Sequence, residues 1–407
     1  MPYDIVIVGA GLTGASAAAT LSHYHSSIAI IDSHDIRVDG ANKIPLRGIA
    51  LSDGSRRILK NIGVWSDIED KVCPVREIRV SRKEAFGATR IRAEDEGIDL
   101  LGCVIQASDL LSSLHKTLHR LDNLTIYSST QVDTAIDQGK HISLSLKQNG
   151  TCHTIKTKLL ILASGRQNDI SNMLGFSFQY KDYKQSAVVT RIYSKSLEQY
   201  TAYERFTSDG LIAVLPYRRG EYIIGRVYVG TAGTTAMNIS DGEFIDQLQQ
   251  DLGNRIDKIY KIGKRTAYPL TLCYAKHVAI GRAVLLGDSA QTIHPVGGQG
   301  LNLSLRDIAF LAEHIYGAPD PGAMGLLDNY CQQRRGDVRK VIYFTHAMAK
   351  LCIGLKPPFA PLLGSGLSIL DMVPPIRRVL VRKTLGLSPP WPRLASGTSI
   401  KSRHATI

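Results

Sequence analysis

The residues best placed to do chemistry lie between 281 and 307, in the order strand, acidic turn, glycine-rich loop and helix. The apolar run Ala283-Val284-Leu285-Leu286 predicts a strand buried on both faces, and it ends at Gly287-Asp288. The loop His294-Pro295-Val296-Gly297-Gly298-Gln299-Gly300 follows, and a helical pattern begins near Leu301-Asn302. Small side chains leave the loop amides accessible, and the helix start adds positive partial charge. We therefore expect the loop to lie against a flat, electron-rich ligand.

A second group of glycines, near the other end of the chain, matches a dinucleotide-binding turn. The run Tyr3-Asp4-Ile5-Val6-Ile7-Val8 predicts a strand that leads into Gly9-Ala10-Gly11-Leu12-Thr13-Gly14 and then into an alanine-rich helix. The first glycine permits the tight turn, the second lets a pyrophosphate approach, and the third lets helix and strand pack closely. The next strand, 27–31, ends at Asp32, 18 residues after Gly14, where a carboxylate can accept hydrogen bonds from a ribose. A purely structural glycine turn is the alternative.

Four polar residues have a chemical role and a structural role to choose between. His294 could relay a proton beside the ligand, because imidazole titrates near neutral pH, or it could be hydrogen-bonded within its loop. Tyr217 could point into a substrate pocket, but with 17 tyrosines in the chain it could equally serve packing. Arg205 and Arg265 could meet a substrate anion, although strand arginines more often form surface ion pairs.

Length and composition describe an ordinary globular protein. The 407 residues suffice for two domains, with 44% apolar and 21% charged residues. The six cysteines, Cys273 and Cys331 among them, form no CxxC pair and no metal-ligand spacing, which favours reduced thiols and no metal site. The first strand begins near residue 3 and no run of 18 apolar residues occurs, so we expect a soluble or peripheral protein without a signal peptide.

The net charge of +13 could serve an anionic membrane, an acidic substrate or nucleic acid. Near the C-terminus, Arg377, Arg378, Arg382 and Lys383 alternate with apolar residues, a pattern that suits an amphipathic helix at a membrane interface. A helix packed on its own domain with a solvated basic face fits equally well. Nucleic-acid binding has little support, because the chain has no basic and aromatic array.

The pattern of elements predicts an α/β protein. A buried strand at 159–162 runs into Ser164-Gly165 and is expected to rejoin the sheet begun at residue 3. Between about 175 and 270 the pattern changes to successive antiparallel strands. We expect a discontinuous Rossmann-like domain with an inserted antiparallel β substrate domain and a C-terminal helical extension. The expected boundaries are 1–174 with 271–350 for the first domain, 175–270 for the substrate domain with a contribution from 70–105, 351–395 for the extension and 396–407 for a flexible tail.

These motifs, taken together, carry a family resemblance over nearly the whole chain. The chain resembles the flavin-dependent aromatic hydroxylases of the para-hydroxybenzoate hydroxylase class, and within them the ubiquinone-biosynthesis hydroxylases of the 2-octaprenyl-6-methoxyphenol hydroxylase type. The matching segments are GAGLTG at 9–14, RGIAL at 47–51, IGVW at 62–65, ERFT at 204–207, LP at 215–216, GKRTAYPL at 263–270 and GDSAQTIHPVGGQGLNLSLRD at 287–307.

The resemblance implies FAD, with its pyrophosphate on the glycines of 9–14 and its adenosine ribose on Asp32. Arg47 would approach the flavin or the pyrophosphate, Asp288 would hold the ribityl chain, and Pro295 to Gly300 would lie along the isoalloxazine. His294, Pro295 and Tyr217 are the candidate catalytic residues. The candidate cofactor-binding residues are Gly9, Gly11, Leu12, Thr13, Gly14, Asp32, Arg47, Ser164, Gly165, Gly287, Asp288, Pro295, Gly297, Gly298, Gln299, Gly300, Leu301 and Asn302.

The reaction that the resemblance implies is insertion of one oxygen atom from O2 into a polyprenylated phenol of ubiquinone biosynthesis, through a flavin C4a-hydroperoxide. NAD(P)H or another donor would reduce the flavin. The partners implied are the prenylated substrate, a membrane surface and other quinone-biosynthesis proteins. The expected location is the cytoplasm, at the inner face of a bacterial membrane.

Two positions depart from the family pattern. Ser164 stands where the family usually has Asp, in a motif linked to FAD and nicotinamide handling, and Ser304 stands where it usually has Gly. The first change bears on how the flavin is reduced. Two alternatives therefore stay open: a flavin monooxygenase for a small soluble aromatic, and a weakly catalytic flavoprotein subunit of a quinone-biosynthesis assembly.

Overall fold

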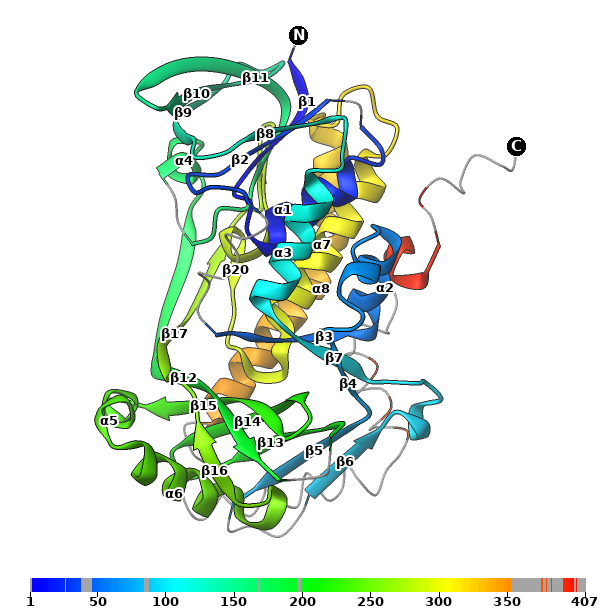
Figure 1. Ribbon diagram of the computed structural model, residues 1–407. Coiled ribbons are helices and arrows are strands. Elements are labelled where there is room, and N and C mark those ends of the chain that lie inside the picture. The colour runs from blue at the N-terminus through cyan, green and yellow to red at the C-terminus, as the bar shows by residue number, and fades with distance from the viewer. Residues whose placement is uncertain are drawn as a thin grey trace.

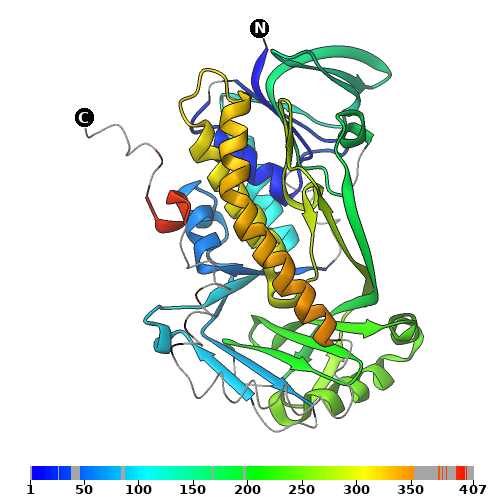
Figure 2. The same cartoon turned by 180° about the vertical axis from the view of Figure 1, so that it is seen from behind.

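A computed structural model describes residues 2–25, 27–37, 46–83, 88–166, 169–195, 199–352, 391–398 and 400, together with Pro375, Arg378 and Arg382. Two large sheets lie at opposite ends of the molecule (Figure 1). The long strands β12 (Phe178–Ser194) and β17 (Thr266–Ala275) and the helix α8 (Met324–Cys352) run from one end to the other (Figures 1 and 2). The 353–374 and 383–390 segments, with most of the predicted basic helix, lie outside the described residues.

The first sheet is the predicted nucleotide-binding sheet, and its centre is parallel. Its strand order is β18-β19-β11-β1-β2-β8, with β9 and β10 extending from β11. The pairs β1 with β2, β1 with β11 and β11 with β19 are all parallel, as continuous apolar runs predict. The strands are β1 Tyr3–Val8, β2 Ile28–Ile31, β8 Leu124–Tyr127, β9 Gln131–Asp137, β10 Ile142–Gln148, β11 Thr151–Leu162, β18 Ala279–Ile280 and β19 Ala283–Leu285.

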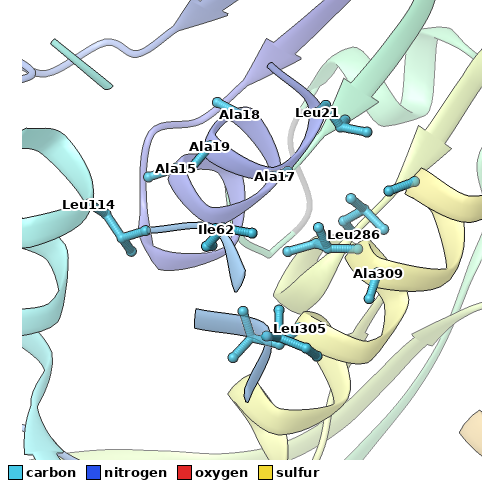
Figure 3. Packing of buried hydrophobic residues seen from close by; sticks show 14 of the residues in the cluster. Ala15, Ala17, Ala18, Ala19, Leu21, Ile62, Leu114, Leu286, Leu305 and Ala309 are labelled. Atoms are coloured by element: carbon cyan, nitrogen blue, oxygen red, sulfur yellow. The ribbon is translucent and has the colours of Figure 1, made fainter. Parts of the chain in front are cut away.

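Helices pack on this sheet through an apolar core that contains many small side chains. The helix α1 (Leu12–Leu21) contacts α3 (Ala107–Leu118) and α7 (Gln299–Ile315). Figure 3 shows the alanines of α1 between Leu114 of α3 and Leu305 and Ala309 of α7. Because alanine adds little bulk, three helices can approach closely here, and α1 is held firmly behind its glycine turn.

The helix α8 (Met324–Cys352) is joined to α7 by a buried ion pair. Arg334 Nη2 lies 2.6 Å from Asp307 Oδ1, and the two side chains are 3% and 4% exposed. Gln291 donates a further hydrogen bond of 2.8 Å to Asp307 Oδ2. Two opposite charges without access to water depend on each other, so this pair fixes α8 relative to the loop that precedes α7.

The second sheet contains nine strands in the described part of the chain, in the order β20-β17-β12-β15-β14-β13-β5-β6, with β16 paired to β12. Segment 77–92 therefore joins strands from 178–292 in one sheet. The strands are β5 Glu77–Arg82, β6 Ala88–Arg92, β12 Phe178–Ser194, β13 Thr201–Phe206, β14 Gly210–Arg218, β15 Glu221–Val229, β16 Ile259–Ile262, β17 Thr266–Ala275 and β20 Gln291–Thr292.

The two faces of this sheet meet different partners. Tyr203, Ile212 and Ile224 point to one face and pack against α6 (Asp241–Leu252). The alternate residues Phe206, Leu211 and Val227 point to the other face and pack with Val296 and Ala349. This second face, here called the inner face, looks toward the glycine-rich loop and α8.

The remaining elements connect the two sheets or cover their edges. A small sheet of order β3-β7-β4 lies between the larger ones. Its strands are β3 Gly48–Ser52, β4 Cys73–Val75 and β7 Gly102–Gln106, and the other helices are α2 Asp53–Asn61, α4 Asp169–Met173 and α5 Ala232–Asn238. Short 3-10 turns occur at Trp65–Asp67, Glu94–Glu96, Gly253–Arg255, Gly287–Ser289, Val296–Gly298 and Arg393–Ser396. Among the described helices, none is long and apolar enough to cross a membrane.

Candidate active site

The glycine turn after β1 is shaped by close backbone contacts. Gly9 has φ +102°, and a Cβ there would lie 2.6 Å from the Ala163 carbonyl oxygen. A Cβ on Gly14 would lie only 1.8 Å from the Gly9 carbonyl oxygen, whereas a Cβ on Gly11 would meet no heavy atom within 4 Å. Gly9 and Gly14 are therefore required by the protein, and Gly11 leaves room for something outside it. No side chain caps α1, so the amides of its first turn, which contains Leu12 and Thr13, can bind an anion.

Asp32 lies directly after β2 and braces this turn. The Ala10 amide donates a hydrogen bond of 2.6 Å to Asp32 Oδ2, and the His34 amide donates one of 2.8 Å to Oδ1. The carboxylate is thus held beside the glycine turn at the carboxyl edge of the parallel sheet, where a ribose next to the pyrophosphate would lie. Its contact with a ribose stays a prediction.

The two motifs from opposite ends of the chain touch each other. Gly287 has φ +63°, and a Cβ there would lie 2.4 Å from Thr13 Oγ1. Ser289 Oγ donates a hydrogen bond of 2.8 Å to the Gly165 carbonyl oxygen, which brings in the turn after β11. Ser164 and Asp288 are both exposed at this meeting point. The ends of β1, β11 and β19 therefore form one continuous edge, as expected for a dinucleotide site.

His294 lies at the start of the glycine-rich loop and is fully buried. The Val296 amide donates to Nδ1 over 3.3 Å, so the proton is on Nε2, which donates to Gln185 Oε1 over 3.1 Å. Burial lowers the pKa of His294 to about 4. Both ring nitrogens are used by the protein and the ring stays neutral near pH 7. These contacts favour a structural role for His294 over a role as a proton relay.

The loop after His294 is held open by hydrogen bonds from its own helix. Asn302 Nδ2 donates to the Gly298 carbonyl over 2.7 Å and to the Ala50 carbonyl over 2.9 Å, and Asn302 Oδ1 accepts from the Ser52 amide over 2.9 Å. The Asn302 side chain therefore holds the loop against β3, and only the backbone of Asn302 is left to bind a ligand. Gly297 and Gly298 both have positive φ, which favours glycine at these positions.

The other loop residues lie around this opening. Pro295 and Gly297 are exposed, and Gly300 and Leu301 are half-buried in the first turn of α7. Gln299 is buried, and its Nε2 donates to the Gly297 carbonyl over 3.0 Å. Arg47 is exposed just before β3. Burial raises the pKa of Tyr268, and the nearby positive charge of Arg47 opposes this rise. The loop, β3 and Arg47 thus enclose one region beside the inner face.

The inner face has a gap in its apolar packing opposite this loop. Glu204 of β13 pairs with Ala213 of β14, which pairs with Gly225 of β15, and these three residues are called the central row. All three are half-buried, and a Cβ on Gly225 would meet no heavy atom within 4 Å. On one side lies the cluster of Phe206 and Val296, and on the other the cluster of Ala202, Tyr217 and Ile223. The central row belongs to neither cluster.

Glu204 also lies at the candidate site, although it is not among the site residues predicted from the sequence. Its Oε1 accepts a hydrogen bond of 3.2 Å from the Gly297 amide, in the middle of the glycine-rich loop. Burial raises the pKa of Glu204, and the Gly297 amide opposes this rise. The alternation in 202–206 was the available signal, because it places a carboxylate on the same strand face as Ala202 and Phe206.

Tyr217 lies on the same face but is held by protein groups. It is buried, its hydroxyl donates to Gln106 Oε1 over 3.3 Å, and the guanidinium of Arg191 lies 4.8 Å from the ring centroid. Burial raises its pKa. Tyr217 therefore forms one end of the space beside the central row, and its catalytic role stays a prediction.

Arg205 and Arg265 bind other parts of the protein. Arg205 Nε donates to the Asp251 carbonyl oxygen and Arg265 Nη1 donates to the Ala236 carbonyl oxygen over 2.7 Å. Both contacts are with the helical side of the sheet, the face opposite the central row. The structure thus does not bring these two arginines to the candidate site.

Comparison with known proteins agrees with this geometry. Residues 2–345 match the family model described as FAD binding domain. An uncharacterized protein of Synechocystis is 29% identical over 405 residues, covering 98% of this chain and 97% of the relative. A ubiquinone hydroxylase, UbiL of Rhodospirillum rubrum, is 27% identical over 98% of this chain and 93% of the relative. The crystal structure of p-nitrophenol 4-monooxygenase PnpA from Pseudomonas putida superimposes with a TM-score of 0.78 at 16% identity, over 94% of this chain and 98% of that one.

Proposed function

The chain belongs to the FAD binding domain family and is an FAD-dependent monooxygenase, and on that premise we propose that it hydroxylates a polyprenylated phenol of ubiquinone biosynthesis. The family match covers residues 2–345 and confirms the resemblance inferred from the motifs. Relatives such as UbiL, whose name describes a ubiquinone hydroxylase, support this substrate class. The α/β fold with a parallel sheet is also confirmed.

The residues present fit FAD. The open space at Gly11 and the uncapped first turn of α1 suit a pyrophosphate, and Asp32 lies where the adjoining ribose would be. Asp288 is exposed and directly follows Gly287, which approaches Thr13, so its carboxylate would be in reach of a ribityl chain. Pro295 and Gly297 would face the isoalloxazine. When bound, the flavin takes hydride from NAD(P)H and activates O2, which is chemistry that no side chain supplies.

The observation that carries the choice of substrate is the central row on the inner face. A flat ring needs a surface without protruding side chains, and Ala213 and Gly225 provide one opposite the glycine-rich loop. Apolar residues border it on both sides, as a ring with an isoprenoid substituent requires. The sheet, β3 and the loop would together keep water from the reacting ring, and they would set which ring carbon faces the flavin.

Turnover under labelled oxygen tests this proposal. The purified flavoprotein would be supplied with NADH or NADPH, with 18O2, and with phenols that carry zero, one or three isoprene units. We expect one 18O atom in the ring of the prenylated product and a higher kcat/KM as the tail lengthens. Labelling of the tail-free phenol alone would instead identify a small soluble aromatic substrate. Oxidation of NAD(P)H without 18O in the ring of any of these phenols would contradict the proposal that the protein hydroxylates them.

We also propose peripheral binding to an anionic membrane. The net charge of +13 and the basic residues of 376–383 support it, and the described Arg378 and Arg382 are both exposed. Deleting residues 363–407 should release the protein from anionic liposomes in a sedimentation assay. Equal sedimentation with and without these residues would contradict the proposal.

A further inference from the structure

The central row contains one ionisable group, and it faces the place where the proposed substrate ring would lie. Glu204 is half-buried, and its cross-strand neighbours are Ala213 of β14, within the row, and Val80 of β5, outside it. Its Oε1 accepts from the Gly297 amide. No residue in the part of the chain that the structure describes donates a hydrogen bond to Oε2. One carboxylate oxygen is thus fixed by the loop, while the other is available to a ligand.

We propose that Glu204 binds the hydroxyl group of the substrate phenol and accepts its proton during oxygen transfer, an inference that rests on the proposed function. The Gly297 amide sets the position of the carboxylate, so Glu204 would hold the ring against the same loop that is expected to hold the flavin. In this arrangement the distance from the hydroxyl-bearing carbon to the flavin is fixed, and with it the ring carbon that is hydroxylated.

The proton balance of this step is closed. The phenol O–H bond breaks, the proton goes to Glu204 Oε2, and the electron pair that remains delocalises into the ring. The ring carbon then forms the new C–O bond as the O–O bond of the two-electron-reduced O2 breaks, and the second oxygen atom leaves as water. The attacked carbon then loses its hydrogen as a proton to solvent, which restores aromaticity, and Glu204 returns its proton to the original oxygen. O2 is the oxidant and NAD(P)H the reductant, as in the proposed reaction, and the glutamate is unchanged after each turnover.

The electrostatics suit a proton acceptor. Burial raises the pKa of Glu204, and the Gly297 amide is the one group that opposes the rise. A carboxylate with a raised pKa is a stronger base than one in water. Among the described residues no charged side chain contributes to this shift, so the basicity depends on how the loop and sheet enclose the group.

Two variants separate proton transfer from hydrogen bonding. Glu204→Gln keeps an acceptor for the phenol but cannot take its proton, and Glu204→Ala has neither ability. Glu69→Gln, at an exposed turn position outside the strands of both sheets, is the matched control. The probe is a 2-prenylphenol with two isoprene units, whose binding is followed through the flavin absorbance, and whose hydroxylation is followed by product analysis under saturating NADPH.

We expect Glu204→Gln to keep its FAD and its affinity for the probe within about fivefold, while the rate of hydroxylation falls by about 10²–10⁴-fold. The acid limb of the pH profile of hydroxylation should disappear in this variant. Glu204→Ala should in addition bind the probe about tenfold more weakly, and Glu69→Gln should match the unaltered protein in every measurement.

Hydroxylation by Glu204→Gln within threefold of the unaltered protein, with the same acid limb, would overturn the proposal. If the unaltered protein binds but does not hydroxylate the probe, the proposed function fails, and the affinity of Glu204→Ala still decides whether Glu204 holds the phenol. Equal affinity in Glu204→Ala and the unaltered protein would then refute its role.

Discussion

Gly225 offers a sharp test of the space beside the central row, because stability and activity should change in opposite directions. Its φ is not positive, and a Cβ would meet no heavy atom within 4 Å. Replacement by Ala therefore costs no steric strain within the protein. Restricting the unfolded chain should raise the free energy of unfolding by about 0.4–1 kcal/mol.

The same carbon occupies space that the proposed substrate needs. In a tight apolar site, one methylene of misfit costs about 1–3 kcal/mol, which is roughly 10–200-fold in kcat/KM. Gly225→Ala should therefore lower kcat/KM for the prenylated phenol by roughly tenfold or more. Gly225→Val, with two further carbons, should lower it below detection while FAD remains bound, since Gly225 lies on β15 of the second sheet and not in the glycine turn at 9–14.

Urea unfolding and steady-state kinetics on the same preparations measure both effects. Gly242→Ala on α6 is the matched control, because Gly242 is exposed and a Cβ there also meets nothing within 4 Å. It should gain stability, as expected for replacing a helical glycine, without loss of activity. If Gly225→Val retained kcat/KM within threefold of the unaltered protein, the substrate ring would not lie over the central row.

Four further changes test the rest of the site. Gly14→Ala places a Cβ 1.8 Å from the Gly9 carbonyl oxygen and should destabilise the fold. Gly11→Ala places a Cβ with no heavy atom of the protein within 4 Å, so this variant should fold normally. It should nevertheless bind FAD at least tenfold more weakly, as measured by flavin absorbance per protein. Arg334→Met leaves Asp307 charged and buried without its partner, so urea unfolding should show a loss of about 3–5 kcal/mol, with exposed Arg335→Met as control. His294 is held neutral with a pKa of about 4 against 6.5 in the unfolded chain, so the unfolded chain binds more protons between these values. The free energy of unfolding should therefore fall by about 3 kcal/mol from pH 6.5 to pH 4, and His294→Gln should lack this part of the slope.

The nucleotide side of the site could be predicted from the sequence because its signals are local. A parallel strand buried on both faces requires a continuous apolar run, and Gly9 and Gly14 are needed by their immediate neighbours. The close approach of Gly287 to Thr13 could be inferred from the sequence only because both motifs are expected to bind the same ligand. The structure shows it directly, as a close approach of glycine and threonine.

The substrate side could not be predicted in the same way. In the antiparallel sheet both faces are covered, so alternation separates Glu204 from Arg205 without saying which of them points toward the loop. The partners of the two residues, Gly297 and Asp251, are distant in sequence. His294 likewise reads as a loop histidine until Gln185, on a strand 109 residues earlier, occupies its second nitrogen.

The threading of the nucleotide sheet has a consequence for the order of events during synthesis. β1 pairs with β2, which is close to it in sequence. Its other partner in the sheet, β11, ends only at Leu162, and β19, which pairs with β11, follows at Ala283–Leu285. Pairing of such distant segments is slow, and the earlier segments must wait with unpaired strand edges. Thr13 gains its contact with Gly287 only when most of the chain has left the ribosome. Cofactor capture therefore comes late in biogenesis, and a shortage of flavin should lower the yield of folded protein more than it lowers synthesis of the chain.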